Sequence, residues 1–236
     1  MGRIWSVCSG SGGVGKSAVA LSLAVGAAKE GQETILLDAS GQARSCDLVL
    51  GLESIISLDM MDVLSGEVEL ASALYVVPAH PRLRFACASL YDAVPAGEMA
   101  GIILALHSMC DVLVIDMPTG MTDAAKGMMR PGDERIVVTR PDAASVRSCE
   151  RLMMRCRGDQ AGLCLVVNRA GRERGRRASQ YTLEAVEYTL DRAALACIPE
   201  DPLIALGEKN GKAAIECDGA AKGPLKAMVK TLLAGA

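Results

Sequence analysis

Eight residues near the start of the sequence restrict what the chain can fold into more than any other feature. Residues 10–17 read Gly-Ser-Gly-Gly-Val-Gly-Lys-Ser and satisfy the spacing G-x-x-x-x-G-K-[ST]. The motif directly follows a mainly apolar run at residues 4–8 and precedes the helix-forming residues 18–21. A strand, a glycine-rich loop and a helix in this order are typical of a phosphate-binding loop. We therefore predict that this loop holds the phosphates of ATP or a similar nucleotide.

Each residue type in the loop has a physical role in phosphate binding. Glycines let the backbone bend so that successive N–H groups converge on phosphate oxygens, and the positive end of the following helix dipole adds to the attraction. Lys16 would neutralise the β- and γ-phosphates, and the Ser17 hydroxyl would complete the coordination of Mg²⁺. The alternative, a glycine-rich turn with a chance lysine, is disfavoured by the flanking strand and helix. The predicted nucleotide-binding residues of the loop are Gly10, Ser11, Gly12, Gly13, Val14, Gly15, Lys16 and Ser17.

The rest of the chain alternates short aliphatic runs with longer helical patterns, which is typical of βαβ units. We therefore predict an α/β fold: a doubly wound, mostly parallel sheet with helices on both faces, in one domain that spans residues 1–236. The predicted strands are residues 3–8, 33–38, 74–78, 111–116, 134–139, 162–168 and 195–198. The predicted helices are residues 16–30, 57–64, 97–108, 143–157, 179–190 and 201–210.

Composition narrows the class of protein. Half of the residues are hydrophobic but only 3% are aromatic, so Ala, Val, Leu, Ile and Met must fill the core. The net charge of −3 gives no overall attraction to nucleic acid or anionic membranes. The segment from Arg169 to Arg177 carries five arginines and is interpreted as a solvated loop, with a patch for an acidic partner or DNA as the alternative. Nine cysteines without a C-x-x-C pair, no signal peptide and no long apolar run favour a cytoplasmic protein with reduced thiols.

Two predicted strands end in aspartate. Asp116 closes the run Val-Leu-Val-Ile-Asp, and Asp38 closes Thr-Ile-Leu-Leu-Asp. Open α/β sheets bind ligands beyond the carboxyl ends of their strands, where a carboxylate can hold a metal ion through a water molecule. A lone aspartate at such a position is often only a turn cap. Two of them beside a phosphate-binding loop favour contact with Mg²⁺, more strongly for Asp116 than for Asp38.

Five further segments, in order along the chain, resemble the MinD/ParA family of deviant Walker A ATPases. The resemblance rests on residues 47–53, 115–120, 137–147, 166–169 and 198–201, in addition to the phosphate-binding loop. It implies ATP and ADP as ligands, with Lys16, Asp38 and Asp116 in the catalytic site. It also implies that Asn168 hydrogen-bonds the edge of the adenine base, with Arg169 and Pro199 beside it.

The sequence departs from the family pattern at two positions. Ser11 stands where the family has its signature lysine, which reaches across a nucleotide-bound dimer to the partner's phosphates. Ser40 stands where the family has a second aspartate, two residues after the position of Asp38, to orient the attacking water. Stabilisation of developing charge usually contributes more than any other effect to the rate of phosphoryl transfer, and serine is a poor base. We therefore expect nucleotide binding to persist and hydrolysis to be weak or absent. The ATP-driven homodimer should be weakened, although a homodimer stays possible.

The last part of the chain allows two interpretations. Residues 222–233 place apolar side chains at helical spacing with lysines opposite, which suits either a membrane anchor or a core helix. Family MinD proteins end in a short membrane-targeting helix. The distance from residues 198–201 favours the last core helix, with the targeting tail missing, so stable membrane insertion is not expected.

The resemblance implies a positioning or assembly factor that acts with a protein partner on a division site, pilus or similar cargo, and recruitment to a cell pole or membrane through that partner. A nucleotide-dependent metal-centre maturation ATPase is the alternative, although such proteins usually carry the paired cysteines that are missing here. A P-loop pseudo-ATPase scaffold and a small-molecule kinase also remain open, since a fold does not decide function.

Overall fold

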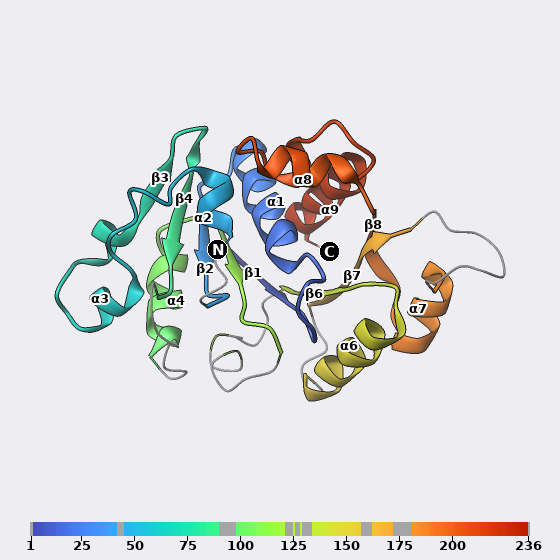
Figure 1. Cartoon of the computed structure of the whole chain (residues 1–236). Coiled ribbons are helices and arrows are strands. Elements are labelled where there is room, and N and C mark those ends of the chain that lie inside the picture. The colour runs from blue at the N-terminus through green and yellow to red at the C-terminus, as the bar shows by residue number, and fades with distance from the viewer. Residues whose placement is uncertain are drawn as a thin grey trace.

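A single mixed sheet runs through the part of the chain that the structure describes. The computed structural model describes residues 2–41, 45–89, 98–120, 125, 128, 134–156, 162–171 and 181–235. Within them, eight strands are ordered β3-β4-β2-β5-β1-β6-β7-β8, and every neighbouring pair except β3–β4 is parallel (Figure 1). The strands are β1 (Arg3–Cys8), β2 (Thr34–Asp38), β3 (Tyr75–Val77), β4 (His80–Cys87), β5 (Val112–Asp116), β6 (Glu134–Thr139), β7 (Leu163–Ala170) and β8 (Ala194–Pro199).

Helices cover both faces of this sheet, as predicted for a doubly wound fold. One hydrophobic core lies under α1 (Lys16–Lys29), α2 (Cys46–Leu50) and α9 (Lys222–Ala234). The core on the other face lies under α3 (Met60–Leu64), α4 (Met99–His107), α6 (Ala143–Arg155) and α7 (Leu183–Leu190). The short helix α8 (Pro202–Glu208) and the 3₁₀ turns η1 (Leu70–Ala73) and η2 (Ala214–Glu216) complete the elements that the structure describes.

The central strands are aliphatic because both of their faces are covered. Every residue of β2 and β5 is buried, and β1 is buried from Ile4 onward. Such strands lack the alternation of polar and apolar residues that a half-exposed strand shows. The seven predicted strands are confirmed, with bounds that shift by at most two residues at either end.

Two elements were not predicted, a strand next to the edge of the sheet and a short helix. Strand β4 has the sequence His-Pro-Arg-Leu-Arg-Phe-Ala-Cys, in which Leu83 and Phe85 are buried while Arg82 is exposed. Its proline and arginines mask an alternating strand pattern. The second element is α2, which has only five residues and therefore little helical periodicity.

Capping residues explain why some helices begin later than predicted. Helix α3 begins at Met60 rather than at residue 57, because Asp59 accepts hydrogen bonds from the backbone N–H groups of Met61 and Asp62 as its N-cap. Helix α7 begins at Leu183 because the Thr182 hydroxyl accepts from Ala185 N in the same way.

The C-terminal segment is a core helix, as expected. In α9 the apolar residues Leu225, Met228, Val229 and Leu232 are buried against the same core as α1. The two helices approach closely at Gly26 of α1, where a Cβ atom would lie 2.6 Å from a methyl carbon of Val229. None of the described helices is long and apolar enough to cross a bilayer.

Candidate nucleotide and cation site

The phosphate-binding loop lies between the carboxyl end of β1 and the first turn of α1, and its glycines have different tasks. Gly15, the N-cap of α1, has φ 88° and Gly13 has φ 73°, a left-handed conformation that favours glycine. A Cβ atom on Gly12 or Gly13 would meet no atom within 4 Å, so this side of the loop is open. A Cβ atom on Gly10 would lie 2.2 Å from the carbonyl oxygen of Ser148 in α6. The loop is therefore packed against α6 on one side and accessible on the other.

Asn168, near the end of β7, also packs against the phosphate-binding loop. Its side chain is buried, and Nδ2 donates a hydrogen bond to the carbonyl oxygen of Val14 over 2.8 Å. Nδ2 also lies 2.2 Å from the place that a Cβ atom of Gly15 would occupy. Asn168 thus contacts the phosphate-binding loop itself. The sequence predicted only a hydrogen bond from Asn168 to the adenine base and did not predict this contact.

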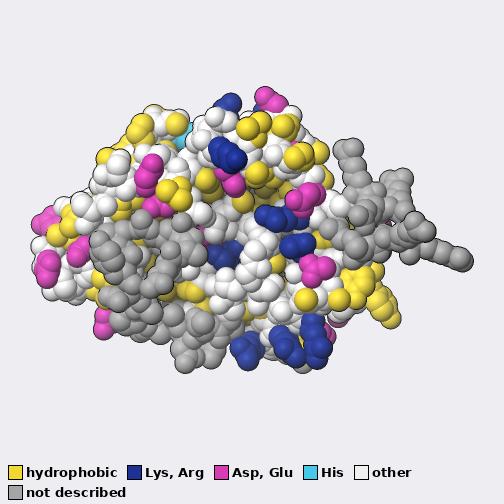
Figure 2. Space-filling view, viewed as in Figure 1, with side chains coloured by type: hydrophobic (Ala, Val, Ile, Leu, Met, Phe, Trp, Pro, Cys, Tyr) yellow, Lys and Arg dark blue, Asp and Glu magenta, His cyan; other side chains and the backbone are white. Residues whose placement is uncertain are grey.

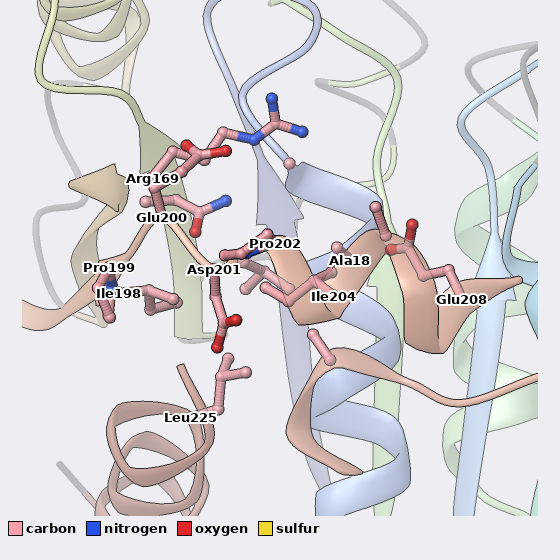
Figure 3. Close-up of a pocket in the computed structure, with 15 residues that line it drawn as sticks. Ala18, Arg169, Ile198, Pro199, Glu200, Asp201, Pro202, Ile204, Glu208 and Leu225 are labelled. Atoms are coloured by element: carbon pink, nitrogen blue, oxygen red, sulfur yellow. The ribbon is translucent and has the colours of Figure 1, made fainter. Parts of the chain in front are cut away.

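The residues expected to surround the base come together in one pocket next to the loop (Figure 3). Asn168, Arg169 and Pro199 line this cavity of about 140 Å³ together with Gly15. Its walls are partly apolar, and its acidic residues were not predicted. One of these is Glu208. Burial raises the pKa of its carboxyl above the ordinary value, and the positive charge of Arg169 opposes only part of that increase. The further lining residues are Ala18, Val19, Ile198, Glu200, Asp201, Pro202, Ile204, Ala205, Ala214 and Leu225.

Lys16 and Asp116 form a buried ion pair at the centre of the site. Lys16 Nζ donates to Asp116 Oδ1, and the two side chains are 7% and 0% exposed. Burial raises the pKa of the Asp116 carboxyl; the positive charge of Lys16 opposes that increase, and the charge of Asp38 adds to it. Since a buried charge needs a partner, Lys16 and Asp116 stabilise each other here. Phosphates would compete for the lysine, and a metal ion would compete for the carboxylate.

Asp38 lies beside Asp116 because β2 and β5 are neighbours and pair these two residues in register. Asp38 Oδ1 accepts hydrogen bonds from the backbone N and the hydroxyl of Ser40, over 3.0 and 2.6 Å. Asp38 Oδ2 is buried without a hydrogen-bond partner among the residues that the structure describes. One oxygen of Asp38 is thus satisfied by Ser40, and the other is available to a cation.

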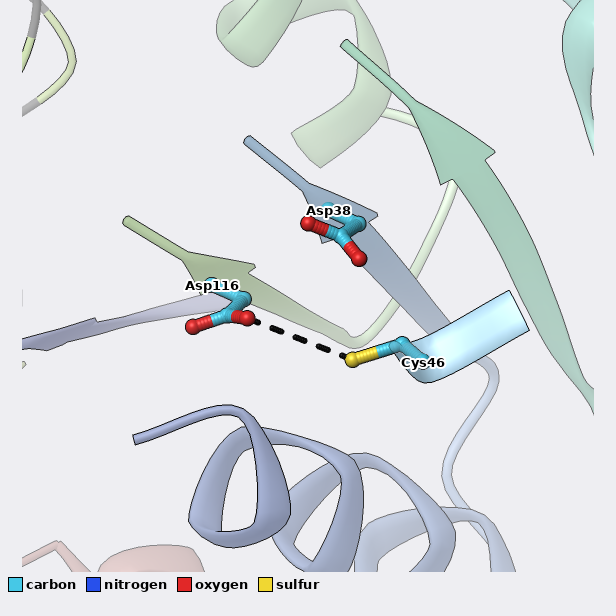
Figure 4. Close-up of side chains that lie close together, drawn as sticks. All are labelled: Asp38, Cys46 and Asp116. Carbon is cyan, nitrogen blue, oxygen red and sulfur yellow. Dashed lines mark hydrogen bonds between the residues drawn. The ribbon is translucent and has the colours of Figure 1, made fainter. Parts of the chain in front are cut away.

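Cys46 is a member of this group that sequence analysis did not find. It begins α2, is 1% exposed, and its Sγ lies 4.0 Å from Asp116 Oδ2 and 4.0 Å from the carbonyl oxygen of Ser17. Figure 4 shows the thiol and the carboxylates of Asp38 and Asp116 around a common space. Burial raises the pKa of the thiol well above its ordinary value, and the two aspartates raise it further. No short spacing motif in the sequence links these three residues.

The donors at this position fit Mg²⁺, which prefers oxygen ligands and keeps several waters. Asp116 offers a carboxylate that also receives a hydrogen bond from the Ser17 side chain, and Asp38 Oδ2 is an unpartnered buried oxygen. Ser17 and Asp116 would hold the ion, as the sequence predicted, with Asp38 close by. When bound to a nucleotide, such an ion neutralises charge on the phosphates.

The face around the site is more basic than the net charge suggests. Figure 2 shows Lys and Arg side chains gathered over α6, where Arg147, Arg151 and Arg155 are exposed at four-residue spacing. The predicted arginine-rich segment begins at Arg169, which is described and lies in the pocket; residues 172–177 lie outside the described part of the chain.

Comparison with known proteins shows the family to which the chain belongs. A family model named ParA and described as the NUBPL iron-transfer P-loop NTPase matches residues 1–232. A septum site-determining protein MinD from Synechocystis is 30% identical over 216 residues, which cover 90% of this chain and 81% of that protein. The chain belongs to the MinD/ParA family of P-loop NTPases.

Solved MinD structures share this architecture. MinD from Pyrococcus horikoshii in complex with Mg-ADP superposes with a TM-score of 0.85 and is 26% identical, over 100% of this chain and 98% of that one. The MinC–MinD cell-division complex of Aquifex aeolicus has a TM-score of 0.88 at 23% identity, over 99% of this chain and 96% of that one. The second likeness concerns the fold alone.

Proposed function

We propose that this MinD/ParA protein is a positioning or assembly factor that binds Mg-ATP and hydrolyses it slowly or not at all. The observation that carries the proposal is the hydrogen bonding of Ser40. Its hydroxyl donates to Asp38 Oδ1, so the group at this position is a neutral donor that is already engaged with its neighbour. A serine in this arrangement is a poor base for an attacking water.

The groups that bind phosphate are retained in the same site. The open side of the loop at Gly12 and Gly13, the buried Lys16 and the Ser17 hydroxyl supply N–H donors, positive charge and a metal ligand. Mg²⁺ on Asp116 would free Lys16 to move from the carboxylate to the phosphates. We place the adenine base in the pocket of Asn168, Arg169 and Pro199, because this cavity adjoins Gly15 at the end of the loop.

Charge at Ser11 is the second part of the proposal. The Ser11 side chain has no positive charge to place near the phosphates, so the developing negative charge of the transition state lacks one stabilising group. Such groups contribute about 10²-fold or more to rate in phosphoryl and acyl transfer. With slow turnover, bound ATP would keep the protein in one state for a long time and so control its binding to a partner, instead of driving repeated cycles of hydrolysis.

The partner of such a switch is a protein. The Synechocystis relative is named a septum site-determining protein, and the Aquifex MinD was solved together with MinC. We propose a comparable role in placing a division site, pilus or other cargo, in the cytoplasm, with recruitment to a pole or membrane through the partner. A weak homodimer fits the same site, since Ser11 cannot reach a second nucleotide as a lysine does.

Restoring the missing groups tests the proposal. We expect the wild type to bind Mg-ATP with little release of phosphate, and Ser11→Lys together with Ser40→Asp to raise turnover at least about tenfold. Ser108→Lys is the matched control, because it adds the same charge at an exposed residue at the end of α4. Wild-type turnover that equals that of the double variant and disappears in Lys16→Ala would contradict the proposal.

A metal-centre maturation ATPase is the second candidate, because the matching family model is described as an iron-transfer NTPase. The sequence lacks the C-x-x-C pair that would hold a metal between two copies. Iron analysis of anaerobically purified protein separates the two candidates: stoichiometric iron favours maturation, whereas iron-free protein that captures division or pilus proteins favours positioning.

A further inference from the structure

We propose that Asp38, Cys46 and Asp116 form a binding site for a thiophilic divalent cation such as Zn²⁺, held by the Cys46 sulfur and one oxygen from each carboxylate. The site shares Asp116 with the proposed Mg²⁺ position, but it does not need a nucleotide. It is distinguished by its donor set, because one of the three ligands is sulfur.

Three elements bring the ligands together. Asp38 ends β2, Asp116 ends the neighbouring β5, and Cys46 begins α2 beside them (Figure 4). One possible ligand atom from each residue lies within 4.8 Å of the other two, and all three residues are buried. In a tetrahedral zinc site, bonds of about 2.3 Å to sulfur and about 2.1 Å to oxygen separate the two ligands by about 3.6 Å. The observed Sγ–Oδ2 distance is 4.0 Å, so a small closing movement of α2 completes that pair.

The unpartnered oxygen of Asp38 is independent support for a cation. Asp38 is 1% exposed, and its Oδ2 has no hydrogen bond of good geometry within the described chain. The Cys46 thiol is the neighbour that interacts with this carboxylate, and it would become a thiolate ligand when the cation binds. Lys16 contacts Asp116, and its single charge balances one of the two buried carboxylates. A buried carboxylate oxygen without a partner is costly, and a bound divalent ion removes that cost.

The sulfur decides which cation the site prefers. Thiolates favour Zn²⁺ and similar soft ions, whereas Mg²⁺ favours oxygen ligands. The Cys46 thiol gives up its proton to solvent when the metal binds, because only the thiolate is a ligand. Three protein ligands leave a fourth position of the zinc shell for water or a phosphate oxygen.

Cobalt(II) alone tests the site, because a thiolate bound to it gives a charge-transfer band in the near ultraviolet. We expect the reduced, full-length wild type to show this band with one equivalent of Co²⁺ and to lose it when Zn²⁺ displaces the cobalt. Cys46→Ser should abolish the band and weaken Zn²⁺ binding at least about tenfold. Loss of a residue that only hydrogen-bonds a metal ligand already lowers metal affinity by about tenfold or more. Asp38→Asn should weaken Zn²⁺ binding as well.

Cys149→Ser is the matched control, because Cys149 is also 1% exposed but lies in α6 and belongs to the core on the opposite face. It should keep the band. A wild type without the band, or a band that survives Cys46→Ser, would overturn the proposal. Thermal stabilisation of the wild type by Mg-ATP, measured separately, distinguishes this site from the proposed function. A wild type that gives the cobalt band but is not stabilised by Mg-ATP would count against nucleotide binding alone.

Discussion

Gly26 in the middle of α1 allows a quantitative test of how α9 packs on the core. In Gly26→Ala the new Cβ atom would lie 2.6 Å from Val229 Cγ2 and 2.9 Å from Ile215 Cδ1. Alanine favours a helix interior over glycine by about 1 kcal/mol, whereas overpacking a core costs about 1–3 kcal/mol. Because Val229 is β-branched and stiff about χ1, it cannot simply rotate away. We expect Gly26→Ala to be neutral or destabilising.

Gly101→Ala supplies the matched control. Gly101 lies inside α4, is exposed, and a Cβ atom there would meet nothing within 4 Å. This variant should therefore stabilise the protein by about 1 kcal/mol through helix propensity alone. The difference between the two variants, about 1–3 kcal/mol, is then the cost of placing a Cβ atom against Val229 of α9 and Ile215 of η2. For a chain of this length it corresponds to about 2–4 °C in Tm per kcal/mol.

Thermal unfolding followed by the fluorescence of Trp5 is a suitable assay, because this single tryptophan is fully buried in β1. In a Val229→Ala background both Val229 methyl groups are gone, and only the terminal Cδ1 of the flexible Ile215 side chain stays close. Most of the penalty of Gly26→Ala relative to Gly101→Ala should therefore disappear. If Gly26→Ala stabilises the otherwise unchanged protein as much as Gly101→Ala does, the close packing of α9 on α1 is refuted.

Two further predictions concern the nucleotide site. Asn168→Ala removes the hydrogen bond to Val14 and should weaken Mg-ATP binding about fivefold in a titration, a loss of about 1 kcal/mol. Asn210→Ala is the control and should leave the affinity unchanged, because the Asn210 amide donates to an exposed carbonyl in α8. An equal loss in both variants would contradict a specific role for Asn168. Burial raises the pKa of Asp116 to about 6, so below that pH Mg²⁺ must displace a proton from this carboxyl. The affinity for ATP in the presence of Mg²⁺ should therefore fall by up to about tenfold per pH unit below pH 6. The affinity for ADP without Mg²⁺ should not fall in this way. Affinity that stays constant from pH 7 to pH 5 would contradict Asp116 as a metal ligand.

The sequence was sufficient for the parts of the fold that depend on local pattern. The phosphate-binding motif places β1, the loop and α1, and continuous aliphatic runs such as β5 mark strands that are covered on both faces. The same reasoning placed Asp38 and Asp116 at strand ends. It could not pair them, because the register that puts them side by side is set by the order of the strands in the sheet.

The missed features depend on contacts between distant residues or on mixed patterns. Strand β4 carries arginines whose side chains pair outside the core, Arg82 with Glu33 for example, and these hide its buried Leu83 and Phe85. The sequence predicts reduced thiols for the nine cysteines because no C-x-x-C pair marks a metal site, and nothing in the pattern distinguishes Cys46 from the others. Its neighbours Asp38 and Asp116 are 8 and 70 residues away, so only the folded chain brings the three together.

Thermal unfolding with and without Mg-ATP, on the wild type and Lys16→Ala, tests the central claim most directly. Ligand at a hundred times its dissociation constant adds about 2.7 kcal/mol of stability, which for this length is a shift of about 5–10 °C. A working nucleotide site predicts this shift in the wild type and its loss in Lys16→Ala, whatever the basal Tm of the variant. No shift in the wild type, or the same shift in both proteins, would contradict binding through the phosphate loop.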